Sequence, residues 1–210
     1  MDDSVYTGSY AKMIEDFKCD MMNKYEMKNL GLLHHFLGIR VIQQEGSIFI
    51  HQKKYALSLL DKFGLKNCKS MSIPLTPTDK LRKNDGSELA YEELYKKIVG
   101  SILYLTTPRL NIIYSTCVLA RYMHCPTTKH LGISKRILRY VQGTIDYGIN
   151  YKKGNVALLI SFYNSDWSGD EDDMKSTSSY AFSFGSGAFS WATVKQQSVA
   201  LSLNYRSRID

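Results

Sequence analysis

The sequence predicts an α+β fold, because its hydrophobic patterns change character along the chain. The first third combines short helical patterns with a β-hairpin, the middle third carries three consecutive helical patterns, and the last third alternates like short strands. With 210 residues, 44% hydrophobic and 22% charged, the chain is long enough to bury a core. No apolar run reaches the roughly 18 residues that span a bilayer, so we expect no membrane partner.

The first third is expected to hold a short strand, a helix, a β-hairpin and a second helix, at residues 1–8, 9–25, 37–43 with 48–52, and 53–63. In the first helix, Ile14, Phe17 and Met21 recur every three or four residues and form one apolar stripe. A turn at 45–47 separates the two β-branched runs of the hairpin. Gly64 is well placed to end the second helix, because glycine adopts the left-handed conformation without strain.

The middle of the chain is expected to begin with a linker. Residues 66–88 contain two prolines, several Ser/Thr residues and an Asn-Asp-Gly string, without sustained periodicity. Three helices are then expected at residues 89–106, 110–123 and 127–142. In the last third, residues 148–151 and 157–162 indicate a pair of strands, and residues 180–184 and 188–191 indicate another pair. A further helix is expected to begin at Lys195.

The formal net charge of +7 is concentrated in the middle of the chain. Residues 91–145 hold eight Lys/Arg against two Asp/Glu, whereas residues 1–90 hold 13 against 11 and residues 146–210 hold six against seven. A basic region of this kind attracts a polyphosphate, because neutralised phosphates release their condensed counterions. Charge alone favours the alternative of a solvated helix face.

Two groups of carboxylates are candidates for metal chemistry. The adjacent pair Asp2 and Asp3 precedes an apolar strand, as in two-metal nucleotidyl transfer, although a flexible acidic N-terminus explains the pair equally well. Asp166 and the run 170–173 follow a strand and offer the oxygen ligands that Mg²⁺ prefers. A polar turn is the alternative explanation of this second group.

Cysteine and N-terminal features indicate an intracellular protein. The four cysteines form no CxxC pair, and too few histidines and cysteines converge for a zinc site. The N-terminus has neither the basic start nor the apolar stretch of a secretory signal, so we expect no secretion. The string 136–139 (RILR) matches the RxLR pattern of secreted effectors, but it lies inside a predicted helix, where its middle residues are expected to pack.

Seven strings are informative together, at residues 24–31 (KYEMKNLG), 33–39 (LHHFLGI), 51–55 (HQKKY), 95–105 (YKKIVGSILYL), 135–144 (KRILRYVQGT), 172–178 (DDMKSTS) and 187–201 (GAFSWATVKQQSVAL). In this order and spacing they resemble the Pol polyprotein of copia-type LTR retrotransposons over nearly the whole chain. The resemblance implies three regions: the C-terminal part of a reverse transcriptase palm with its hairpin (1–75), a helical thumb and connection (76–145), and a truncated RNase H-like region with a mixed sheet (146–210).

The family is an RNA-directed DNA polymerase and ribonuclease H that uses Mg²⁺, and its thumb contacts the backbone of an RNA–DNA template–primer. The resemblance therefore assigns the basic middle region to phosphate binding. The residues implied are Lys96, Lys97, Arg109, Arg121, Lys135, Arg136 and Arg139.

Departures from the family pattern fall at the catalytic positions. Asp2 and Asp3 match the end of the family's Tyr-Val-Asp-Asp turn, so we expect the chain to start inside the polymerase site, without the fingers and the earlier metal-binding Asp. Asn164 replaces the first metal-binding Asp of the RNase H strand, and a neutral amide weakens Mg²⁺ binding. Tyr205 and Ser207 stand where the family has two glutamates, one of them catalytic.

The sequence thus favours a degenerate, catalytically inactive fragment that binds no metal and retains weak affinity for nucleic acid. Two alternatives remain. The chain could be an active polymerase or RNase H component completed by another chain, or a co-opted effector-like interaction protein. The sequence does not fix the oligomeric state.

Overall fold

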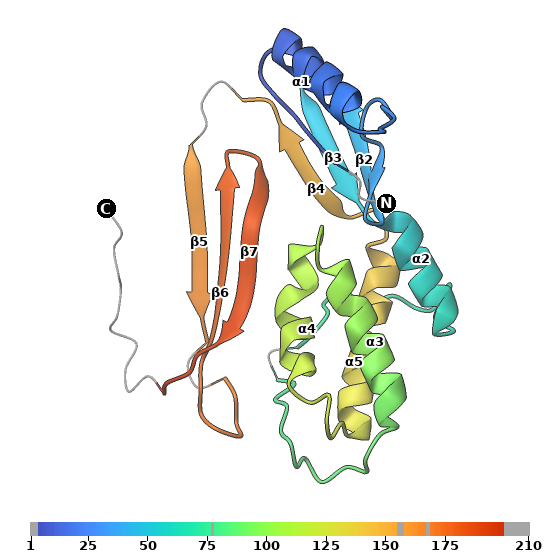
Figure 1. Cartoon of the computed structure of the whole chain (residues 1–210). Coiled ribbons are helices and arrows are strands. Elements are labelled where there is room, and N and C mark those ends of the chain that lie inside the picture. Colours follow the sequence, from blue (N-terminus) through green and yellow to red (C-terminus); the bar gives the residue numbers. More distant parts are fainter. Residues whose placement is uncertain (1–3, 77, 155–157, 167–168, 200–210) are drawn as a thin grey trace.

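The computed structural model describes residues 4–76, 78–154, 158–166 and 169–199, which form two antiparallel sheets and a block of helices (Figure 1). In chain order the elements are α1 (Ala11–Lys24), β1 (His35–Phe36), β2 (Ile39–Gln44), β3 (Ser47–His51), α2 (Lys53–Lys62), α3 (Glu92–Leu105), the 3₁₀ helix η1 (Leu110–Ile112), α4 (Ile113–Ala120), α5 (Thr128–Gly143), β4 (Gly148–Lys152), β5 (Leu159–Ser165), β6 (Thr177–Phe184) and β7 (Gly187–Lys195). The predicted α+β class is confirmed.

The first sheet has the strand order β1-β2-β3-β4. The predicted hairpin is present as β2 and β3, with Val41 opposite Ile50. β4 completes the sheet from far along the chain and places Ile149 opposite Ile50. The predicted pairing of 148–151 with 157–162 is therefore wrong, because the free edge of β3 takes up β4 and buries Ile149. Residues 4–8 form no strand, and the rest of the expected segment 1–8 lies outside the described residues.

The main core lies among α2, α3, α4 and α5. Each of these helices contributes fully buried side chains, among them Leu60, Ile102, Leu119 and Ile137. Gly64, with a φ of 66°, ends α2 as the sequence predicts. In contrast, α1 buries none of its residues. No helix within the described ranges is long and apolar enough to cross a membrane.

The expected linker packs along the helical block. The described part of residues 66–88 contains no helix or strand, as predicted. However, Leu81 is buried, and its carbonyl accepts a hydrogen bond of 3.0 Å from the Tyr122 hydroxyl. This segment is therefore fixed against the turn that follows α4 and brings its charged residues to defined positions.

The second sheet has the order β5-β6-β7 and is antiparallel, with a register shift at 182/183. Every strand pairing in the described residues is antiparallel, whereas the resemblance implied a mixed sheet here. β7 continues to Lys195, and residues 196–199 form no helix. The remainder of the expected C-terminal helix lies outside the described residues.

Candidate nucleic-acid interface

Helix α5 presents a basic face because its opposite face is held in the core. The hydroxyl of Thr127 accepts a hydrogen bond from the backbone N–H of His130, whose ring Nδ1 accepts one of 3.0 Å from the backbone N–H of Thr127. This reciprocal cap defines the start of the helix. Ile133, Ile137 and Val141 then form a buried stripe. The basic side chains of the helix lie on its other side and are exposed or half-buried: Lys129, Lys135, Arg136 and Arg139.

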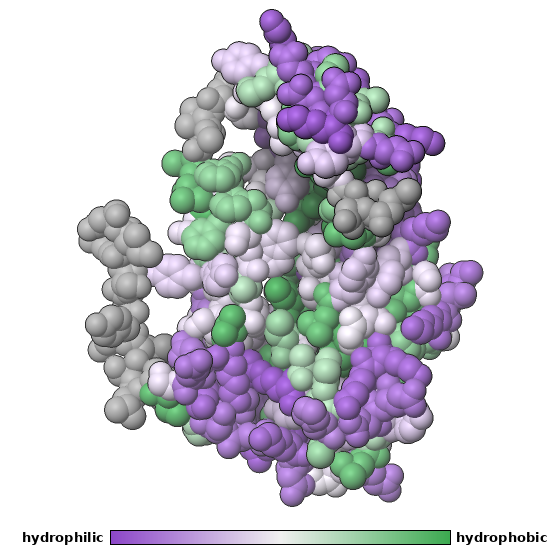
Figure 2. Space-filling model, viewed as in Figure 1, coloured by the Kyte–Doolittle hydropathy of each residue, from purple (hydrophilic) through white to green (hydrophobic). Residues whose placement is uncertain are grey.

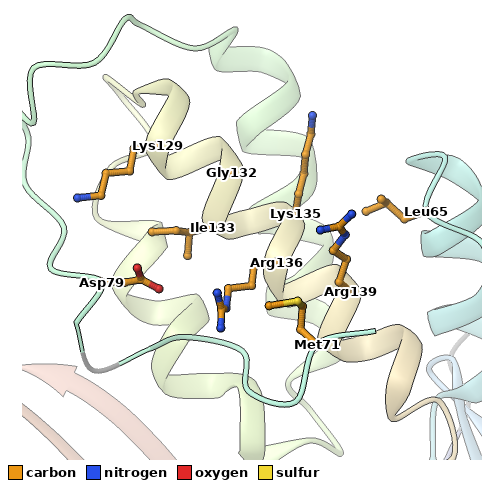
Figure 3. Close-up of a pocket in the computed structure, with 9 residues that line it drawn as sticks. All are labelled: Leu65, Met71, Asp79, Lys129, Gly132, Ile133, Lys135, Arg136 and Arg139. Carbon is orange, nitrogen blue, oxygen red and sulfur yellow. The ribbon is translucent and has the colours of Figure 1, made fainter. Parts of the chain in front are cut away.

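The outward face of α5 borders a groove of about 590 Å³ (Figure 3). Its floor and rim comprise Leu65, Met71, Asp79, Lys129, Gly132, Ile133, Lys135, Arg136 and Arg139. Six of these residues belong to α5, and the other three come from the segment between α2 and α3. Gly132 leaves the middle of the groove open, because nothing lies within 4 Å of the Cβ that an alanine would place there.

Four cations line this groove without a carboxylate partner in the described part of the chain: Lys129, Lys135, Arg136 and Arg139. Two of them donate to backbone carbonyls, at 3.2 Å from Lys129 Nζ and 3.4 Å from Arg136 Nε. The one acid of the groove, Asp79, accepts hydrogen bonds from Thr76. The groove therefore offers positive charge that is free to bind an anion.

Two of the predicted nucleic-acid-binding residues are already paired within their own helix. Lys97 lies 2.6 Å from Glu93 on α3, and Lys96 forms the equivalent pair with Glu92, each one helical turn apart. These lysines are exposed and away from the groove, and their charge is locally balanced.

Arg109 is the predicted residue whose position differs most from the expectation. It is 2% exposed, donates a hydrogen bond to the Thr144 hydroxyl and lies over the Tyr147 ring at 5.7 Å. Its Nε and Nη1 have no hydrogen-bond partner among the described residues, and burial lowers the pKa of the guanidinium. In this conformation it cannot reach a phosphate outside the protein.

Arg121 belongs to an ionic contact between the end of α4, which it directly follows, and the loop after β5. Its guanidinium lies 3.2 Å from the carboxylate of Asp170, which is buried and also 2.5 Å from Lys195. Arg121 also donates to the Thr177 hydroxyl at 2.8 Å. Burial opposes ionisation of Asp170, but the bond from Lys195 and the charge of Arg121 lower its pKa overall. The acidic group that the sequence suggested for Mg²⁺ is used here to attach the second sheet.

The described donor set around Asn164 does not fit Mg²⁺. Asn164 is exposed on β5 and stands opposite Ser179. The nearby Asp166 accepts hydrogen bonds from the Thr177 backbone N–H and, at 3.0 Å, from the Tyr114 hydroxyl. Within the described ranges, no three His, Cys, Asp or Glu side chains are grouped to hold a metal ion. Asp2, Asp3, Tyr205 and Ser207 lie outside the described residues.

Sequence reasoning missed one cation of the groove and two beside it. Lys129 precedes Arg136 by seven residues, and this two-turn spacing places both on one face of a helix, so periodicity could have found it. Lys80 and Arg82 had no such signal. Their partner Glu171 is 89 residues from Arg82 and approaches only in the folded chain.

Comparison with known proteins identifies the family. Residues 1–77 match the family model of reverse transcriptase (RNA-dependent DNA polymerase). The chain is 35% identical over 210 residues to the retrovirus-related Pol polyprotein from transposon RE1 of Arabidopsis thaliana, which covers 99% of this chain but only 14% of that polyprotein.

Two shorter proteins are also similar. An uncharacterized mitochondrial protein of A. thaliana is 33% identical over 96% of this chain and 84% of its own length, and secreted RxLR effector protein 161 of Plasmopara viticola is 37% identical over 51% and 77%. No solved structure matches the chain significantly. The family model and the near-complete coverage by transposon polyproteins show that the chain belongs to the family of retrovirus-related Pol polyproteins of copia-type transposons.

Proposed function

We propose that this reverse transcriptase-related chain binds the sugar–phosphate backbone of nucleic acid through the basic groove of α5 and does not itself polymerise or cleave nucleic acid. In this proposal residues 1–75 correspond to the end of a palm, 76–145 to a thumb and connection, and 146–210 to an RNase H-like region. The observation that supports it is the set of four cations around one open groove, which have no carboxylate partner in the part of the chain that the structure describes.

The groove has the chemistry of a backbone-binding surface. Lys129 and Arg136 are seven residues apart, so they are separated by about 10 Å along the helix axis, about three base-pair steps of a duplex. Arg139 lies one further turn along, next to Leu65 in Figure 3. Such contacts position a backbone without reading its sequence. We therefore expect binding to RNA–DNA hybrids and other duplexes with strong salt dependence.

The absence of catalysis is proposed from the RNase H strand. Asn164 supplies a single neutral oxygen, and the carboxylate of Asp166 is engaged by Thr177 and Tyr114. An Mg²⁺ ion needs several hard oxygen ligands in octahedral geometry. These residues leave too few free anionic oxygens for one.

The binding proposal is tested by comparing two double variants on a fluorescent RNA–DNA hybrid across a salt series. Arg136→Gln/Arg139→Gln removes two groove cations, so affinity should fall about tenfold or more and the slope of log K against log salt should lose about 1 per residue. The matched control is Lys96→Gln/Lys97→Gln, which removes two paired, exposed charges. Equal losses in both variants would contradict a specific groove.

The alternative of an active nuclease is tested with Mg²⁺ and a labelled RNA–DNA hybrid. The unaltered chain should release no product, and Asn164→Asp restores one missing carboxylate for comparison. Clear cleavage by the unaltered chain, lost when EDTA removes Mg²⁺, would overturn the proposed inactivity and support a complete site.

A secreted effector role has less support, although an effector protein is among the similar proteins. Ile137 and Leu138, the middle residues of the RxLR-like string, are fully buried in α5. An exposed linear motif at 136–139 would require that helix to unfold. The similarity is therefore better explained by a shared transposon-derived fold.

A further inference from the structure

The basic groove continues beyond α5 onto the segment before α3. Lys129 Nζ donates to the backbone carbonyl of Lys80 at 3.2 Å, and Asp79 itself lines the groove. Lys80 therefore lies beside Lys129 of α5, and Arg82 follows two residues along the same segment. Their side chains remain 67% and 58% exposed, so both are accessible at the surface.

A single carboxylate on the loop between β5 and β6 pairs with both of these cations. Glu171 lies 2.9 Å from Lys80 Nζ and also accepts from Arg82 Nε, while its own side chain is only 14% exposed. The hydrogen bonds from Arg82 and Lys80 hold the pKa of Glu171 at about 2, so it is ionised at neutral pH. Proteins also bind a phosphate in this way, with one anion between an ammonium group and a guanidinium group.

The loop that carries Glu171 is fixed on both sides of this residue. Asp170 is buried against Arg121 and Lys195, and Asp172 accepts two hydrogen bonds from the backbone N–H of Lys83, at 3.0 and 2.9 Å. Figure 1 places this loop at the lower end of the second sheet, beside the segment that leads to α3, and Figure 2 shows a largely hydrophilic surface there. These contacts fix the position of the loop, and the loop in turn holds the Glu171 carboxylate next to Lys80 and Arg82.

We propose that Glu171 is an internal phosphate mimic that occupies the second half of a basic track, in which Lys80 and Arg82 extend the groove of α5. A nucleic-acid backbone then competes with Glu171 for these two cations. This inference rests on the proposed binding function and adds its regulation. While Glu171 pairs with Lys80 and Arg82, only the cations of the α5 groove are available to nucleic acid. When the nucleic-acid backbone replaces Glu171, Lys80 and Arg82 become available as well. The side chains of Lys80 and Arg82 are largely exposed, and ion pairs formed by exposed cations are individually weak, so a polyanion held at several points can replace Glu171 on them.

The test is Glu171→Gln, which keeps the shape of the side chain but removes its charge. With an RNA–DNA hybrid, affinity should rise several-fold at low salt, and the slope of log K against log salt should steepen by up to about 1 per released cation. The matched control is Glu45→Gln in the exposed turn between β2 and β3, which changes the net charge equally. It should leave the slope unchanged.

Adding Lys80→Gln and Arg82→Gln to Glu171→Gln should return the slope to that of the unaltered chain. If Glu171→Gln behaves like Glu45→Gln while Arg136→Gln/Arg139→Gln still weakens binding, the mimic is refuted and the groove stands. If no form of the chain binds, both proposals fail.

A second measurement does not depend on how the variant folds. In the unaltered chain, the side-chain Nε–H resonance of Arg82 should shift on titration with the hybrid, because its partner changes from carboxylate to phosphate. An Arg82 resonance that stays constant at saturation would refute the exchange.

Discussion

At the residue scale, His130 is the side chain whose state most directly affects the start of α5. It is fully buried, stacks on Tyr122 with a ring separation of 4.1 Å, and accepts the backbone N–H of Thr127. Burial is the main cause that lowers its pKa below 6.5. A protonated ring would turn this acceptor into a donor and oppose the Thr127 N–H.

His130→Gln tests this arrangement, because glutamine can also serve as the acceptor of a capping box but does not titrate. Since the folded-state pKa lies below the unfolded value, the unfolded chain binds protons first, and stability falls as the pH drops below about 6.5. Urea unfolding from pH 7.5 to 5 should show a steeper loss for the unaltered chain than for the variant. A difference between them that is constant with pH would contradict the proposed role.

Residues also show where sequence reasoning reaches its limit. Lys135, Arg136 and Arg139 could be selected from charge and helical pattern, and the structure places all three at the groove. Arg109 could not be separated from them, because its burial depends on the packing of Thr144 and Tyr147 around it. The pairing of Arg82 with Glu171 joins distant segments and has no local signal.

At the element scale, α5 contains a central glycine, Gly132, that no close contact requires. A central glycine costs about 1 kcal/mol relative to alanine, and the added methyl group at Gly132 would meet nothing within 4 Å. Gly132→Ala should therefore raise the free energy of unfolding by about 1 kcal/mol, or Tm by about 2–4 °C for a chain of this size. Thermal unfolding followed by circular dichroism measures the change.

Gly143 provides the matched control at the end of the same helix. A Cβ there would lie 2.8 Å from the side chain of Ser70, closer than ordinary contact. Gly143→Ala should accordingly lower Tm or leave it unchanged. Equal stabilisation by both substitutions would show that helix propensity alone, and not local space, decides the effect.

The helices and strands differ in how well the sequence predicted their positions and their strand partners. The hairpin β2–β3 and helices α2 to α5 follow from local periodicity and turn residues, and their predicted positions agree with the structure to within a few residues. The partner of β4 did not follow, because a short apolar strand can join any free edge. Here the edge of β3 was available to Ile149, whereas β5 paired with β6.

At the scale of the whole molecule, polar contacts contribute much of the attachment of the second sheet to the helical block. Asp170 links Arg121, which directly follows α4, to Lys195 of β7, and the Tyr114 hydroxyl of α4 donates to Asp166. The first sheet also contacts β7, where the Tyr151 hydroxyl of β4 donates to the carbonyl of Ala188 at 2.8 Å. The main apolar core, by contrast, lies within the helices. The sheet should therefore open before the helices unfold.

Asp170→Asn tests this order of stability. The substitution leaves Arg121 and Lys195 without their shared charge, and because both cations are partly exposed we expect a loss of about 1–3 kcal/mol, less than for a fully buried pair. Hydrogen exchange should show this loss at the amides of β6 and β7, while α3 and α5 keep their protection. Equal loss in the sheet and the helices would contradict this order and mean that the molecule opens as one cooperative unit. The packing of α4 against β7 would then couple the two parts more strongly than the buried carboxylate does.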